Sequence, residues 1–141
     1  MPTTPQPLTL LAKADALGAV TRFVREGARK ANLAEARMDE LDLLVEEIFM
    51  NIARHSYPED APGVVSVMYS LSGPGELAVE FGDQGVEFNP LGVSPPDLTS
   101  DLAQRRVGGL GVFLLKEFAD SLSYRREQGW NRLTFGVSAK P

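Results

Sequence analysis

Cysteine is absent from the 141-residue chain, and histidine occurs only once, as His55. Without cysteine the chain can form neither a disulfide nor a thiolate-ligated metal site. One histidine cannot build a metal centre that uses several imidazoles. Disulfide-stabilised folds and metal centres rich in cysteine or histidine are therefore excluded.

Excess positive charge and long apolar runs are also missing. The formal net charge is −5, which argues against nucleic acid and anionic membrane as partners. The basic pairs Arg105–Arg106 and Arg125–Arg126 are too short to change that balance. Runs such as VFLL are far shorter than the roughly 20 residues that span a bilayer. The N-terminus has no basic and apolar signal-peptide pattern, so we expect a cytoplasmic protein.

The length and the 43% of hydrophobic residues are typical of one globular domain with a real core. Residues 1–7 contain three prolines and two threonines, which predicts a flexible lead. We expect residues 8–141 to form a single domain.

Two amphipathic helices are predicted in the first half. Over residues 16–31 apolar side chains recur every three or four positions, with Asp15 as the expected N-cap and Asn32 at the end. The second predicted helix runs from Met38 to about Ser56 and ends before a proline. Its expected buried stripe consists of Leu41, Leu44, Val45, Ile48 and Ile52.

Short alternating segments predict strands, and turn residues join four of them into two hairpins. The predicted strands are Leu8–Leu11, Val64–Leu71, Leu77–Phe81, Ser121–Arg126 and Asn131–Val137. We expect Asp83–Asp101 to form a long lid or binding loop. We expect Leu110–Phe118 to form a largely buried helix. This order predicts an α/β fold (an α+β two-layer sandwich) with a mostly antiparallel sheet covered on one face by helices.

The second helix places Glu47, Asn51 and His55 at i, i+4 and i+8, along one edge. Asn51 offers a neutral oxygen to a hard cation such as Mg²⁺, and Glu47 could accept a proton. Glu46 competes for that second role but lies about 100° further round the helix. The alternative for Glu47 and Asn51 is a solvated polar edge, as on most amphipathic helices. His55 could be a phosphoacceptor, a phosphate contact or a cap at the end of the helix.

The segment FGDQGVEFNP follows a predicted strand. A carboxylate at Asp83 could accept a hydrogen bond from an exocyclic amine such as that of adenine, and Gly85 permits close backbone approach. An ordinary Asp-x-Gly β-turn is the alternative.

The segment VGGLGVFLLK begins at Val107 and contains three glycines. Backbone N–H groups there could point at phosphate oxygens. It is not a P-loop, because Lys116 falls seven residues after Gly109 and no serine or threonine follows it. We expect Lys116 on the surface. A glycine hinge into a buried helix is the alternative.

Taken in order, these motifs resemble the Bergerat-fold (GHKL, histidine-kinase-like) ATPases. The segments VEEIFMNIARHSY, GDQGVEFNP, GGLGVFLLKEFADSLSYRR and NRLTF are similar to the RsbW/SpoIIAB-type branch, the anti-sigma-factor serine kinases. The resemblance runs from about Leu8 to the C-terminus.

The resemblance implies that ATP or ADP and Mg²⁺ bind between the second helix and the long loop. It makes Glu47 the general base, Asn51 the magnesium ligand, and Asp83, supported by Gly85, the adenine-reading group. Arg54 and His55 fall where some relatives contact phosphate. The implied phosphate-cradling residues are Gly108, Gly109, Leu110 and Gly111.

This sequence departs from the family pattern at three places. Glu87 replaces a second glycine after D-x-G, and Asn89 replaces an aspartate before proline. The adenine-contacting threonine has no clear equivalent; Asn131 and Thr134 both remain open.

The resemblance implies an ATP-dependent serine/threonine kinase that phosphorylates a STAS-domain anti-anti-sigma protein in a partner-switching system. A sigma factor would be the competing partner, and the kinase would form a homodimer. The alternative is a nucleotide-gated protein-binding module with little or no kinase activity.

Overall fold

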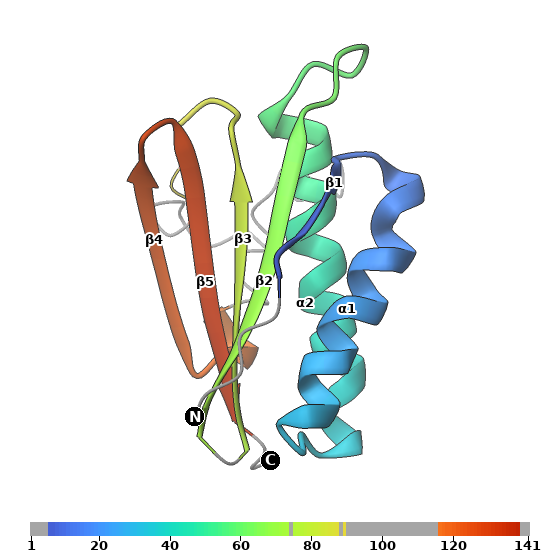
Figure 1. Ribbon diagram of the computed structural model, residues 1–141, viewed down its shortest axis with the longest axis vertical. Helices are drawn as coiled ribbons and strands as arrows, with labels where there is room; N and C mark the ends of the chain where they lie inside the picture. The colour runs from blue at the N-terminus through green and yellow to red at the C-terminus, as the bar shows by residue number, and fades with distance from the viewer. Residues whose placement is uncertain (1–5, 74, 88, 90–115, 139–141) are drawn as a thin grey trace, which may run out of the picture.

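Two helices lie side by side across one face of an antiparallel sheet (Figure 1). This computed structural model describes residues 6–73, 75–87, 89 and 116–138. Within them the sheet has five strands in the order β1-β2-β3-β5-β4. The two-layer α/β arrangement expected from the sequence is confirmed.

The element order also follows the prediction. The elements are β1 (Leu8–Leu11), η1 (Ala14–Ala16), α1 (Leu17–Lys30), η2 (Glu35–Arg37), α2 (Met38–Asn51), η3 (Ile52–Ser56), β2 (Val64–Gly73), β3 (Glu76–Asp83), β4 (Ser121–Glu127) and β5 (Trp130–Ser138). The predicted loop Asp83–Asp101 and helix Leu110–Phe118 lie largely outside the described residues. Only the end of that helix is described, and residues 116–118 are helical.

Both predicted hairpins form, and a long-range pairing joins them. β2 pairs with β3, and β4 pairs with β5. The strands β3 and β5 then pair antiparallel, which sets Asp83 opposite Asn131 and Leu77 opposite Val137. The last residue of β3 therefore meets the beginning of β5 at one end of the sheet.

α1 packs its apolar stripe against the sheet. Val20, Val24 and Ala28 are buried, and the helix ends where Asn32 adopts a left-handed φ of 59°, as predicted. The expected N-cap at Asp15 was wrong. Asp15 lies inside the short 3₁₀ turn η1, and α1 begins after Ala16 with no side-chain cap, because the chain enters the helix through that turn.

α2 lies beside α1 in the helical layer (Figure 1). All members of its predicted stripe are buried, and Phe49 is fully buried beside them. Arg25 of α1 makes a double hydrogen bond to the carboxylate of Asp42, at 2.9 and 2.5 Å. This pair shows which side of α2 faces α1. The last turn is not α-helical: Ile52–Ser56 forms the π-helical turn η3.

Within the described part of the chain, no helix combines the length and apolar character needed to cross a membrane.

Candidate functional site

Glu47 and Asn51 lie on the flank of α2 that faces away from α1. Asp42 marks the α1 side through its pair with Arg25. At about 100° per residue, Glu47 and Asn51 are rotated from Asp42 by roughly 140° and 180°. Both residues are half-buried. The predicted polar edge is therefore a partly covered flank rather than a fully solvated surface.

The surroundings of Glu47 change the pKa of its carboxyl group. Partial burial raises its pKa, the negative charge of Glu46 raises it further, and the positive charge of Arg54 opposes both. Glu46 itself is exposed. Of the two neighbouring carboxylates, Glu47 therefore has the environment suited to holding and releasing a proton.

The turn after β3 is bound to η3 and to Tyr57, which follows it. The hydroxyl of Tyr57 donates to the carbonyl of Val64 and accepts from the backbone N–H of Gln84, each at 2.6 Å. A β-carbon on Gly85 would overlap the backbone carbonyl of Ser56. Only glycine can bring the two backbones this close. Asn51 is the last residue of α2, five residues before Ser56.

Asp83 is a buried residue, and one of its two carboxylate oxygens accepts hydrogen bonds from the protein. Only 5% of its surface is exposed. Oδ1 accepts from the backbone N–H of Gly85 at 2.9 Å and from Nδ2 of Asn131 at 3.0 Å. Among the described residues no group donates to Oδ2. A carboxylate oxygen in this state is an acceptor for a ligand N–H.

Asn131 is the partner of Asp83, and Thr134 is not. Asn131 lies on the helix-facing side of β5, directly opposite Asp83. Thr134 lies on the other face of the sheet, where its hydroxyl is 3.3 Å from Glu80 Oε1. Of the two residues left open by the sequence, Asn131 is the one beside the carboxylate.

Two β4 residues that sequence reasoning missed complete this cluster. The hydroxyl of Tyr124 donates to Asn131 Oδ1 at 2.7 Å. Nη1 of Arg126 donates to the same oxygen at 3.1 Å and to the carbonyl of Gly85 at 2.9 Å. The sequence signal was available, because a hairpin closed at Gln128 and Gly129 pairs Arg126 with Asn131.

The structure brings some predicted site residues together and leaves others outside the described region. Asp83 and Gly85 meet the end of the helix that carries Glu47 and Asn51. Arg54 and His55 are exposed in the η3 turn, and Lys116 is exposed as predicted. The predicted phosphate-cradling residues Gly108, Gly109, Leu110 and Gly111 lie outside the described residues.

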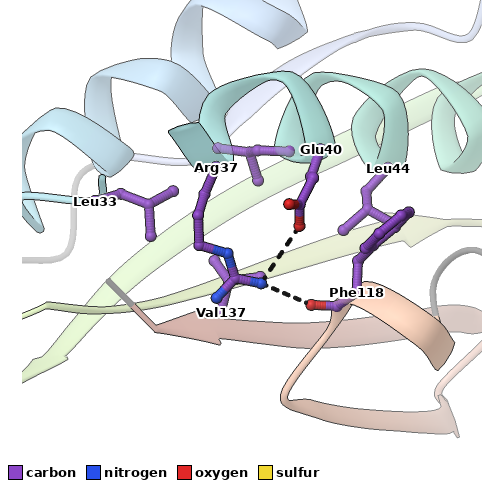
Figure 2. A pocket seen from close by; sticks show the side chains of 7 residues that line it. Leu33, Arg37, Glu40, Leu44, Phe118 and Val137 are labelled. Atoms are coloured by element: carbon purple, nitrogen blue, oxygen red, sulfur yellow. Dashed lines mark hydrogen bonds and ion pairs between the residues drawn. The ribbon is translucent and has the colours of Figure 1, made fainter. Parts of the chain in front are cut away.

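A small apolar hollow lies at the other end of α2 (Figure 2). It is lined by Leu33, Arg37, Glu40, Leu41, Leu44, Phe118 and Val137. Val137 pairs with Leu77, six residues along β3 from Asp83, or about 20 Å. The hollow is therefore separate from the Asp83 cluster.

The donor set on α2 fits a hard cation that takes most of its ligands elsewhere. An amide oxygen and a half-buried carboxylate suit Mg²⁺, which usually keeps waters and binds substrate phosphates. In the part of the chain that the structure describes, no group of three or more histidines and carboxylates could hold an ion. A magnesium site here would depend on oxygens supplied by a ligand.

Comparison with known proteins places these observations in a family. Residues 10–137 match the family described as "Histidine kinase-like ATPase domain". The chain is 29% identical over 101 residues to "Serine/threonine-protein kinase BtrW" of Bordetella bronchiseptica, covering 72% of this chain and 70% of that protein. It is 26% identical over 106 residues to "Serine-protein kinase RsbW" of Listeria monocytogenes, covering 72% and 67%.

A solved structure shares the fold. It contains the RsbU and RsbW domains of Rv1364c from Mycobacterium tuberculosis, with a TM-score of 0.62 and 16% identity. The match covers 95% of this chain and 32% of that one, so this chain spans about a third of the longer protein.

Proposed function

Since the chain belongs to the histidine kinase-like ATPase domain family, we propose that it is a cytoplasmic, ATP-dependent serine/threonine protein kinase. Its substrate would be a STAS-domain anti-anti-sigma protein in a partner-switching system. The relatives named as serine-protein kinases support this activity.

One observation carries the nucleotide-binding part of the proposal. Asp83 is buried and fixed through Oδ1, while Oδ2 has no donor among the described residues. The 6-amino group of adenine would donate to Oδ2. The base would then sit against the turn that contacts the end of α2, within reach of the flank carrying Glu47 and Asn51.

Phosphoryl transfer would occur along that flank. Asn51 would hold Mg²⁺, which neutralises phosphate charge when bound. Glu47 would accept the proton of the attacking serine or threonine hydroxyl. The hydroxyl oxygen would then bond to the γ-phosphorus, while the bond between the γ-phosphorus and the oxygen that bridges it to the β-phosphate breaks. The products would be ADP and a phosphorylated protein. The raised pKa of Glu47 makes it a stronger base than an ordinary glutamate.

Other groups would bind the triphosphate. We assign the backbone N–H groups of Gly108, Gly109, Leu110 and Gly111 to the β- and γ-phosphates, by the resemblance of that segment. Arg54 and His55 would add positive charge or hydrogen bonds from the end of the helix. Both side chains are exposed and therefore accessible to a ligand.

The proposed partners are a STAS-domain protein, a competing sigma factor and a second copy of the chain. The apolar stripe of α1 is already buried in the core. A homodimer would therefore have to use other surfaces than that stripe. Sedimentation velocity with and without ATP would measure the oligomeric state; a monomer under both conditions would contradict the homodimer.

Calorimetry tests nucleotide binding. We expect the wild type to bind ATP and ADP with Mg²⁺, and Asp83→Asn to lose at least about tenfold in affinity, since an amide turned toward adenine is a weaker acceptor than a carboxylate. Asp39→Asn, an exposed change on the first turn of α2, is the matched control. Unchanged affinity in Asp83→Asn would refute the adenine site.

Phosphotransfer tests the activity. ATP labelled on the γ-phosphate would be mixed with a purified STAS-domain protein, and the labelled residue identified. Glu47→Gln should bind ATP normally but transfer at least about 100-fold more slowly; Glu46→Gln should remain active. Nucleotide binding with no transfer to any STAS-domain protein would favour the nucleotide-gated binding module instead.

A further inference from the structure

Asn131, Tyr124 and Arg126 form one hydrogen-bonded group around Asp83. Nδ2 of Asn131 donates to Asp83 Oδ1 at 3.0 Å and to the carbonyl of Val86 at 2.8 Å. Its Oδ1 accepts from Tyr124 and Arg126, at 2.7 and 3.1 Å. These four bonds engage both the nitrogen and the oxygen of the side-chain amide.

The chemistry of the neighbours fixes the orientation of the amide. Arg126 can only donate, so the atom that faces it must be the amide oxygen. An ionised Asp83 and the carbonyl of Val86 can only accept, so the atom between them must be the amide nitrogen. A flipped amide would place its N–H donors against the donor Arg126 on one side, and its oxygen against the two acceptors of Asp83 and Val86 on the other.

The same group holds the turn that follows β3. Arg126 donates to the carbonyl of Gly85, and Asn131 donates to the carbonyl of Val86. Val86 is one of two large apolar side chains that are exposed among the described residues, at 69%. An exposed turn is thus joined to two strands, and a charged donor strengthens one of the bonds.

We propose that Asn131, Tyr124 and Arg126 are positioning residues for recognition of the purine. They fix the Asp83 carboxylate through Oδ1, so that Oδ2 faces the ligand as an acceptor only. A 6-aminopurine donates to that oxygen, whereas a 6-oxopurine presents an acceptor and is rejected. The inference rests on the proposed nucleotide site and adds to it the residues that make the base reading selective.

A structural role alone would lower all affinities together. If the group only stabilised the fold, its loss would lower the affinities for ATP and ITP in equal proportion. If the group positions Asp83, its loss would lower the affinity for ATP more than the affinity for ITP. ITP has no 6-amino group from which Asp83 could accept a hydrogen bond. The ratio of the two affinities therefore separates the two explanations.

The experiment measures ATP and ITP affinities by calorimetry with Mg²⁺ on the full chain. The wild type should prefer ATP by at least about tenfold, since a buried acceptor left facing another acceptor is costly. Asn131→Leu and Arg126→Gln should each reduce that ratio by about tenfold or more, and Tyr124→Phe by less, because Arg126 still holds the amide. Arg126→Lys should restore part of the preference.

Arg125→Gln provides the matched control. Arg125 is adjacent in sequence but pairs with Glu80 on the opposite face of the sheet, so the ATP/ITP ratio should stay at the wild-type value. Thermal melts identify variants that do not fold; Tyr124→Phe removes a single hydroxyl and keeps the test available if Asn131→Leu unfolds.

The outcomes separate the two proposals. A wild type that binds no adenine nucleotide would overturn the proposed function. A wild type that prefers ATP, together with Arg126→Gln and Tyr124→Phe that keep the full preference, would overturn the positioning role alone.

Discussion

The backbone carbonyl of Ser56 lies so close to Gly85 that a β-carbon there would overlap it. Ser56 ends the π-helical turn after α2, and Gly85 lies in the turn after β3. This contact joins the helical layer to the sheet at the Asp83 cluster. π-Helical turns within longer helices occur frequently at functional sites. Here the turn places Ser56 against Gly85, whose backbone N–H donates to Asp83.

Replacing Gly85 by alanine should therefore damage the site. The clash is with backbone rather than with a flexible side chain, so the turn must move away from Ser56. Overpacking of this kind costs about 1–3 kcal/mol, and adenine-nucleotide affinity should fall by at least about tenfold. Thermal melts and calorimetry measure the two effects.

Gly18→Ala is the control for Gly85→Ala. Gly18 is exposed on α1, and an added methyl group there meets only the end of the Arg22 side chain at 3.4 Å. Alanine at a helical position should stabilise the fold by about 0.5–1 kcal/mol. Gly85→Ala with wild-type stability and nucleotide affinity would contradict the importance of the close contact.

The sequence predicted the elements well because their signals are local. The three- and four-residue spacing of buried positions defined α1 and α2, and the turn residues defined both hairpins. The N-cap at Asp15 failed because a 3₁₀ turn precedes α1, and residue type alone does not fix where such a helix begins. The π-helical turn carries no local signal; its end meets Tyr57 and Gly85 through the fold.

The arrangement of the candidate site could be predicted only in part, because some of its contacts are not local in sequence. Asp83 and Gly85 are recognisable from a strand followed by D-x-G. The choice between Asn131 and Thr134 needs the face of β5, which the alternation of Leu133, Phe135 and Val137 already indicated. The contributions of Tyr124 and Arg126 depend on the register of β4 against β5. The hairpin turn at Gln128 and Gly129 indicated that register, but which donors would meet Asn131 needed the structure.

Arg37 joins three elements at the hollow opposite the Asp83 cluster (Figure 2). Its guanidinium donates to the carbonyls of Ser138 at 2.8 Å and Phe118 at 3.0 Å, and lies 3.6 Å from Glu40. Its side chain is only 11% exposed. The residue thus fastens the beginning of α2 to the end of β5 and to the helical residues 116–118.

Arg37→Ala should lower the free energy of unfolding by about 3 kcal/mol, because two carbonyls lose a charged donor. Arg37→Lys should recover only part of the loss, since an ammonium group cannot reproduce the planar fork. Urea denaturation measures both. Arg29→Ala, at an exposed position of α1, should change stability by less than about 0.5 kcal/mol; an equal loss in both alanine variants would contradict the assignment.

Glu47→Gln should make the fold more stable at neutral pH while it removes phosphotransfer. Burial raises the pKa of Glu47 above its ordinary value of 4.5, so the folded state binds a proton more readily than the unfolded state. The contribution of Glu47 to stability is therefore present at low pH and is lost as pH rises through the raised pKa. In thermal melts the glutamine variant should have a higher Tm than the wild type at pH 7, and the same Tm below pH about 4. A glutamine variant that is less stable at pH 7 would show that the ionised carboxylate has a stabilising partner.

The acid limb of the pH–rate profile should move in opposite directions when the two charges near Glu47 are removed. Glu46 raises the pKa of Glu47, so Glu46→Gln should shift the limb of kcat to lower pH. Arg54 lowers that pKa, so Arg54→Gln should shift the limb to higher pH. Saturating ATP separates this effect from any loss of phosphate contact, which would appear in KM. Glu59→Gln, an exposed change beyond the helix, should leave the limb in place. Because the two variants carry charge changes of opposite sign, a shared shift in one direction would exclude Glu47 as the titrating base, whereas opposed shifts identify it.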